Sequence, residues 1–200
     1  MGIIEVGGRP EAFTGRQRWS LFLTLAFSAV ALYVGTYLRD EALNATVTFV
    51  DSQAGIRAEY PENWLVNTTG DAAFQVRDLA TSGFKTTIKI AIQPINPDVT
   101  TERNVLDALT LQRAQTLPSY TVQSVEAYTL PNEDEAVRVD YTFVAVAENP
   151  FLESVPIVVQ GVDMLVNRQG QALVISFQYD VSTFQQNFAV FERFLDTLEF

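Results

Sequence analysis

The sequence predicts one membrane-spanning helix followed by a single α+β domain, in which an antiparallel sheet is flanked by helices. Three observations support this fold class. Residues 19–38 form a run of twenty residues without a charge. Residues 46–93 and 121–179 contain short runs in which apolar and polar side chains alternate, which is typical of half-buried strands. Residues 101–117 and 184–198 instead repeat their apolar side chains at helical spacing.

The uncharged run is long enough to cross a bilayer. At about 1.5 Å rise per residue, a helix over residues 19–38 is roughly 30 Å long, which is the thickness of the hydrocarbon core. It divides the chain into a tail at residues 1–18, the span at 19–38, a linker at 39–45 and a domain at 46–200.

The charges beside the span predict its orientation. Arg16 and Arg18 directly precede it, whereas Asp40 and Glu41 follow it. Because positively charged flanks stay in the cytoplasm, we expect a single-pass protein of the cell membrane with a cytoplasmic N-terminus. The C-terminal domain is then exported to the periplasmic or extracellular side.

A cleaved signal peptide is the competing interpretation of the same run. The apolar region of a signal peptide is usually about 7–15 residues long and ends in small residues. Ala29-Val30-Ala31 resembles such a cleavage site, but apolar sequence continues as far as Leu38. The length of the run therefore favours an uncleaved anchor.

Small residues line one face of the expected membrane helix. They follow one another at spacings of four, four, three and four residues: Ser20, Thr24, Ser28, Ala31 and Gly35. Such a stripe lets two helix backbones approach closely in lipid. Our hypothesis is that this face packs on another transmembrane helix, from a second copy or a different subunit. The alternative is that it has no such role, since small residues occur in many membrane helices.

The chain contains neither cysteine nor histidine. Thiolate and imidazole metal ligands, Ser-His-Asp triads and haem attached through Cys-x-x-Cys-His are therefore excluded. The sequence also has no glycine-rich phosphate loop and no Gly-x-Ser-x-Gly motif. We accordingly expect no catalytic residues, no cofactor and no metal site, and thus a protein that is not an enzyme.

The exported domain is strongly acidic. The tail carries three arginines against two glutamates, so the whole-chain net charge of −11 leaves −12 on the residues after the span. A domain with this charge repels nucleic acid and anionic lipid. The densest acidic run, Glu133-Asp134-Glu135, lacks the spaced ligands of a calcium loop, which favours a solvated turn. Two carboxylates that act together in glycoside chemistry remain an alternative, although nothing selects a pair among 24 acidic residues.

Periodicity also predicts the individual elements. Strands are expected at residues 46–50, 56–60, 73–78, 85–93, 121–130, 136–147, 156–167 and 172–179. A helix is expected over residues 101–117, and a second begins at a Ser182 or Thr183 cap. The second helix places one apolar stripe against the sheet, formed by Phe184, Phe188, Phe191, Leu195 and Leu198.

Three short segments resemble PsbP-like domains. Residues 55–64, Gly-Ile-Arg-Ala-Glu-Tyr-Pro-Glu-Asn-Trp, are similar to the opening of that family, in which a strand runs into Tyr-Pro, a short turn and Trp. The strand at 172–177 and the closing segment at 194–200 are similar as well. The resemblance covers about residues 46–200. It implies a PsbP-like α/β/α sandwich.

The resemblance also implies a class of function. Such relatives mostly serve as extrinsic, non-catalytic subunits or assembly factors of membrane complexes, including photosynthetic ones. Some relatives bind metal through histidine, which this chain lacks, so no metal site is carried over.

The sequence therefore predicts a non-catalytic, single-pass accessory or assembly subunit of a larger membrane complex. The complex is expected to be a respiratory or photosynthetic electron-transfer assembly, in which this chain carries no redox centre. Its expected partners are integral membrane subunits and, through residues 19–38, the bilayer, but not nucleic acid. The alternative is an exported ligand-binding or carboxylate-based enzymatic domain tethered to the membrane.

Overall fold

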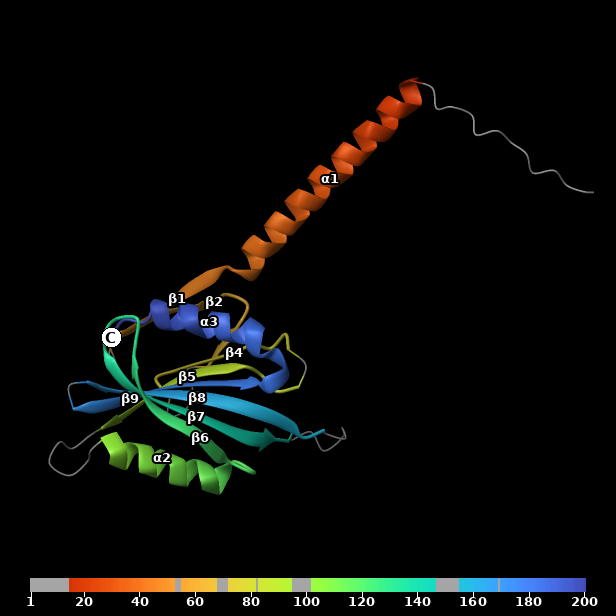
Figure 1. The fold of residues 1–200 in the computed structure, drawn as a ribbon. Coiled ribbons are helices and arrows are strands. Elements are labelled where there is room, and N and C mark those ends of the chain that lie inside the picture. The colour runs from red at the N-terminus through yellow and green to blue at the C-terminus, as the bar shows by residue number, and fades with distance from the viewer. Residues whose placement is uncertain are drawn as a thin grey trace, which may run out of the picture. The chain divides into compact units, whose positions relative to one another are not determined.

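The computed structural model describes residues 15–52, 55–67, 72–81, 83–94, 102–146, 155–168 and 170–200. The chain forms two compact units, Met1–Asn44 and Ala45–Phe200. The first unit contains the helix α1 (Gly15–Leu43). The second contains β1 (Thr46–Asp51), β2 (Ile56–Pro61), β3 (Leu65–Asn67), β4 (Phe74–Arg77), β5 (Thr87–Pro94), α2 (Glu102–Thr116), β6 (Thr121–Thr129), β7 (Glu135–Ala145), β8 (Ile157–Arg168), β9 (Gln171–Asp180), the 3₁₀ turn η1 (Val181–Thr183) and α3 (Phe184–Asp196) (Figure 1).

Helix α1 extends beyond the uncharged run at both ends. The segment 39–45, expected to be a linker, is helical as far as Leu43. No proline or glycine interrupts it, so the backbone hydrogen bonds continue past the charged residues. Asn44 follows the helix, and both its backbone amide and its side-chain amide donate to the Asp40 carbonyl, at 3.0 and 2.7 Å.

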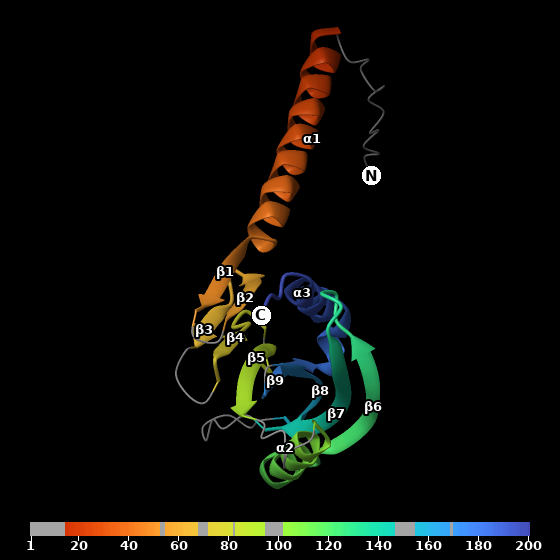
Figure 2. The same ribbon diagram turned by 90° about the vertical axis from the view of Figure 1, so that its left-hand side faces the viewer.

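The second unit is built on a seven-stranded antiparallel sheet in the order β3-β4-β5-β9-β8-β7-β6. Consecutive strands form two hairpin series, β3 to β5 and β6 to β9 (Figure 2). The series meet where β5 pairs with β9, from Thr87 opposite Gln178 to Pro94 opposite Gln171. This sheet, together with its flanking helices, confirms the predicted α+β class.

Helices cover both faces of the sheet (Figure 1). On one face, α3 and the separate hairpin β1-β2 enclose the larger core, whose fully buried side chains include Phe74, Phe177 and Phe191. On the other face, α2 contributes Val105 and Leu109 to a smaller core. Because strands β8 and β9 lie between the two cores, they are buried on both faces, and their sequences read as almost continuous apolar runs.

The stripe predicted for α3 packs on the sheet as expected. Phe191, Leu195 and Leu198 are buried and Phe188 is partly buried, while the side chain of Phe184 lies outside the described residues. Phe194, which was not expected on this stripe, is also buried and stacks on Phe74 at 5.9 Å between ring centroids. The buried face of α3 is therefore wider than a single stripe.

The predicted cap of α3 is wrong. Thr183 occupies the N-cap position, but its side chain does not bond the free amides of the helix. Its hydroxyl instead donates to the Asp180 carbonyl and accepts from the Asn187 amide, at 2.9 and 2.8 Å. The Ser182 hydroxyl donates to the Asp180 carboxylate. Both hydroxyls therefore donate to Asp180, at the start of the 3₁₀ turn that precedes α3. Residue type alone does not predict this.

The short strand β3 was not predicted. It contains three residues, too few for an alternating pattern to stand out, and it pairs only with β4. Its position at the end of the sheet follows from pairing and not from its own sequence.

Candidate functional site

The five residues predicted to form a helix-packing face all lie on α1, and all are exposed. At about 100° per residue they fall within an arc of about 80°. The Thr24 hydroxyl donates to the Ser20 carbonyl at 2.9 Å, so this polar group is satisfied within its own helix. A Cβ added at Gly35 meets nothing within 4 Å. The face thus carries only short side chains, and the Thr24 hydroxyl on it needs no hydrogen-bond partner from outside the helix.

Within the described part of the chain, α1 is the one helix that is long and apolar enough to cross a membrane. None of its residues is buried. Its exposed large side chains range from Val34, 46% exposed, to Phe27, 75% exposed.

The acidic run at residues 133–135 lies at the tight turn between β6 and β7. Glu133 adopts a positive φ of 71°, and the Asp134 amide donates to the Asn132 side chain at 3.2 Å. Among the described residues, no group of three acidic side chains could hold a metal ion. The run serves the geometry of a turn.

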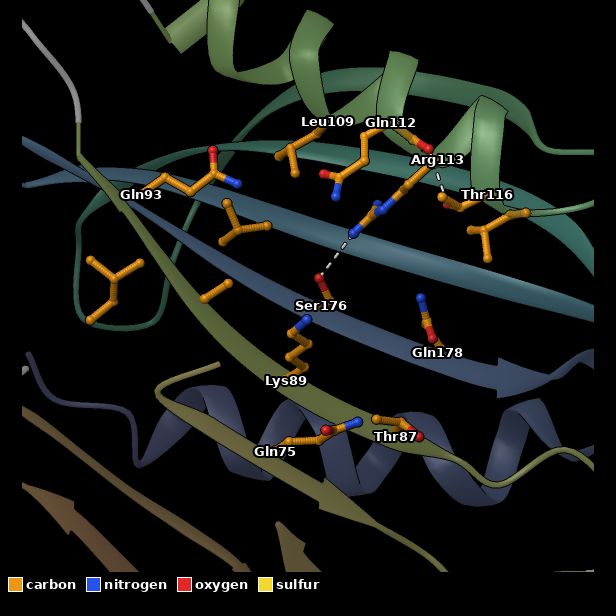
Figure 3. A pocket seen from close by; sticks show the side chains of 14 residues that line it. Gln75, Thr87, Lys89, Gln93, Leu109, Gln112, Arg113, Thr116, Ser176 and Gln178 are labelled. Carbon is orange, nitrogen blue, oxygen red and sulfur yellow. Dashed lines mark hydrogen bonds between the residues drawn. The ribbon is translucent and has the colours of Figure 1, made fainter. Parts of the chain in front are cut away.

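A cleft of about 450 Å³ lies between α2 and the sheet, beside β4, β5 and β9 (Figure 3). Its volume is within the range of small-molecule sites. Four of its lining side chains are glutamine amides, Gln75, Gln93, Gln112 and Gln178, and two are cationic, Lys89 and Arg113. None of the described residues that line it is acidic.

Arg113 forms a buried ion pair at one side of the cleft. It projects from α2 to Asp163 on β8, where its two terminal nitrogens contact both carboxylate oxygens. The Asp163 side chain is only 3% exposed. One guanidinium nitrogen also donates to the Ser176 hydroxyl at 3.2 Å (Figure 3). The Asp163 charge is therefore neutralised by Arg113 inside the protein.

Tyr141 completes this polar cluster beneath α2. Its ring lies under the Arg113 guanidinium, 4.5 Å from the ring centroid. Its hydroxyl donates to Asp163 at 3.4 Å and accepts from Gln178 at 3.0 Å. Burial raises the pKa of the Tyr141 hydroxyl above its usual range, against the opposing attraction of Arg113. The hydroxyl thus stays protonated and serves as a fixed donor.

Lys89 faces Ser176 directly across the β5-β9 pair (Figure 3). The Lys89 side chain is partly buried. Among the residues that the structure describes, no carboxylate lies within the 4.0 Å of an ion pair with Lys89. Lys89 therefore gives the cleft a positive charge that no acid among the described residues offsets by an ion pair.

A second ion pair lies on the opposite face of the sheet. Arg138 donates to both oxygens of Asp140, each at 2.9 Å, and Ser124 donates to the same carboxylate at 3.0 Å. Burial, with the nearby Asp140 charge as a smaller contribution, raises the pKa of the Tyr179 hydroxyl to about 12.

The sequence predicted no residue of the cleft. In sequence, Lys89 stands between Ile88 and Ile90, which is the pattern of a solvent-facing position on a strand. Asp163 is the residue from which a buried ion pair could have been predicted, because a lone carboxylate inside the apolar run of β8 is costly unless a cation neutralises it. The identity of that cation depends on how α2 crosses the sheet.

No protein-family model matches the sequence, and no curated protein matches it. Solved structures are similar to it. The solution structure of cyanobacterial PsbP (CyanoP) from Synechocystis sp. PCC 6803 matches with a TM-score of 0.56 at 13% identity, over 78% of this chain and 92% of that chain. The domain has a PsbP-like fold.

A second structure agrees with this fold. The crystal structure of LpqN, involved in cell envelope biogenesis of Mycobacterium tuberculosis, matches the chain with a TM-score of 0.52 at 12% identity, over 82% of this chain and 95% of that chain. At such identities the likeness concerns the fold alone. The side chains of the cleft in this PsbP-like domain must therefore be interpreted from their own chemistry.

Proposed function

We propose that the chain is a membrane-anchored, non-catalytic accessory or assembly subunit of a larger membrane complex. Residues 19–38 span the bilayer, residues 1–18 remain in the cytoplasm, and the PsbP-like domain is displayed on the periplasmic or extracellular side. The partners are integral membrane subunits, for which an electron-transfer complex of respiration or photosynthesis is the leading class. The chain itself carries no redox centre.

The observation that carries the proposal is the exposure of α1. Each square ångström of apolar surface left in water costs about 25 cal/mol, and α1 has large apolar side chains along its whole length that are about half exposed or more. A bilayer removes this cost. The stripe from Ser20 to Gly35 adds a surface on which a partner helix can pack.

The polar chemistry of the domain supports a binding role over the carboxylate-based enzyme. The cleft exposes no carboxylate from the described residues. Asp163, which is paired with the lining residue Arg113, accepts hydrogen bonds from it on both oxygens. A carboxylate held in this way is a poor general base, because a nearby cation favours its charged form.

The fold supports the accessory role by analogy only. One structure of similar fold is a cyanobacterial PsbP, and another is a protein involved in cell envelope biogenesis. The description of LpqN is consistent with a domain that works at the cell envelope.

Membrane topology can be tested by cysteine labelling, since the chain has no cysteine of its own. Val6→Cys reports on the tail, and Val125→Cys reports on the domain, where Val125 is 50% exposed on the edge strand β6. In intact cells a membrane-impermeant maleimide should label Val125→Cys only, and lysis should make Val6→Cys reactive. The reverse pattern would contradict the orientation.

Anchoring and partnership need two further measurements. Intact-mass spectrometry of the purified protein should find residues 1–18 retained, whereas a mature N-terminus near residue 32 or 46 would show a cleaved signal peptide. Purification in mild detergent should bring down integral membrane subunits with the chain. A lone monomer would contradict the accessory role.

A further inference from the structure

We propose that the cleft between α2 and the sheet binds a small hydroxylated carboxylate, such as a sugar acid. This inference stands apart from the anchoring proposal, because it concerns only the side chains of the PsbP-like domain. It rests on three properties of the cleft: its uncompensated charge, the chemistry of its walls and its size.

The charge of the cleft matches a single carboxylate. The Arg113 charge is balanced by Asp163, with which it forms two contacts. Lys89 is left as one cation without an acidic partner among the described residues. The domain as a whole is strongly negative, so its surface repels anions. Lys89 makes the cleft locally positive, and an anion is therefore attracted to the cleft. A phosphate monoester carries nearly two charges at neutral pH, and the described lining side chains would match only one of them.

The walls match the hydroxyl groups of a polyol. Each glutamine amide both donates and accepts hydrogen bonds, as a hydroxyl group does. Gln75 and Gln93 approach the cleft from the sheet, and Gln112 approaches it from α2 (Figure 3). The Gln75 oxygen already accepts from the Arg77 guanidinium, at 2.8 and 3.0 Å, so Gln75 offers the cleft its NH₂ group as a donor. A ligand with hydroxyls on several carbons can pair with this donor and with the amides of Gln93 and Gln112, whereas an apolar ligand cannot. Leu109 and Val174 supply a small apolar patch that suits the C–H face of a sugar ring.

The Ser176 hydroxyl is the second contact expected for the carboxylate. It stands opposite Lys89 in the β5-β9 register and already accepts from Arg113. Its own proton is therefore directed away from Arg113 and is available to a ligand oxygen. Lys89 and Ser176 together provide two donors to one carboxylate, with the hydroxyls of the ligand facing the glutamines.

Calorimetric titration of the full-length protein in detergent micelles tests this assignment with four probes. D-Glucuronate carries one carboxylate, D-glucose none, D-glucosamine a positive charge, and glucose 6-phosphate nearly two negative charges. We expect glucuronate to bind at least about tenfold more tightly than the other three, since a charge-assisted hydrogen bond contributes about that factor. Absence of binding by glucuronate at 10 mM would overturn the proposal. Tighter binding of glucose 6-phosphate, or equal binding of glucose, would overturn the assignment to a carboxylate.

Lys89→Gln removes the charge and keeps a polar side chain. It should lower the affinity for glucuronate about tenfold or more, and it should bring that affinity close to the affinity for glucose. Arg193→Gln is the matched control, because it makes the same change of charge at an exposed position of α3, on the other face of the sheet. Thermal unfolding checks that both variants are folded. Unchanged glucuronate binding in Lys89→Gln, or an equal loss in Arg193→Gln, would refute the role of Lys89.

Discussion

The ring of Tyr141 lies against the backbone of Gly161, its partner across the β7-β8 pair. A Cβ built on Gly161 would stand 2.5 Å from the Tyr141 hydroxyl oxygen, and closer still to the ring carbons. Both residues are buried. The glycine is thus required by close approach of a neighbouring side chain and not by backbone conformation.

Gly161→Ala should therefore destabilise the domain by about 1–3 kcal/mol, the usual cost of overpacking a core. The free energy of unfolding in urea measures the effect. The same substitution in a Tyr141→Leu background supplies the control, because the smaller side chain leaves room for the new methyl group. Equal costs in the two backgrounds would show that the clash with Tyr141 is not the cause.

Tyr179 makes stability depend on alkaline pH. An unfolded tyrosine has a pKa of about 10, whereas folding raises the pKa of Tyr179 to about 12. Between these values the unfolded chain loses a proton that the folded chain keeps, so the free energy of unfolding falls as pH rises and is unaffected below about pH 9.

Tyr179→Phe should remove about 2 kcal/mol of that fall between about pH 9 and 12. Unfolding curves of wild type and variant at pH 8, 10 and 11.5 would measure it, with pH 8 as the internal reference. An identical pH dependence in both proteins would contradict the assignment to Tyr179.

At the scale of the element, α2 is fixed to the sheet by little apolar contact and one ion pair. Val105 and Leu109 are its buried apolar side chains among the described residues, and Arg113 joins its last turn to β8. Removing one member of a buried pair leaves the other charge without compensation, which costs about 3–5 kcal/mol. The pair thus decides where the last turn of α2 lies.

Arg113→Leu should accordingly lower the free energy of unfolding by about 3 kcal/mol or more. Adding Asp163→Asn should restore most of it, because the unpaired charge is then gone. Arg103→Leu, at an exposed position of the same helix, is expected to change stability by less than about 0.5 kcal/mol. Chemical denaturation of the three variants tests this, and a failure of Asp163→Asn to rescue would contradict the account.

Elements were more predictable than sites in this chain. The strands β1, β2 and β4 to β9 and both domain helices follow from apolar periodicity, since apolar side chains recur in each at the spacing of its backbone. The cleft could not be predicted in the same way. Gln75, Lys89 and Gln112 are ordinary polar residues of exposed faces in sequence, and they converge only because α2 crosses the sheet beside β5.

At the scale of the whole molecule, the proposed anchoring predicts that the stripe on α1 packs on a partner helix. If the stripe packs on a partner helix, Thr24→Leu or Gly35→Leu should abolish the association, because the larger side chain separates the two backbones. Ala29→Leu is the matched control, since it enlarges a small residue about 140° around the helix from the centre of the stripe.

Native electrophoresis of the three variants from mild detergent measures the association. Loss of the complex in Thr24→Leu and Gly35→Leu but not in Ala29→Leu is the expected result. Unchanged assembly in all three would refute the stripe as an interface.

The seven-stranded sheet can be completed only after β9, its last strand in sequence, has been made. β5 pairs on one side with β4 and on the other with β9, and Thr87 and its partner Gln178 are about ninety residues apart in the chain. Until β9 has been made, β5 presents an unpaired apolar edge. Contacts so distant in sequence slow folding and prolong exposure to aggregation.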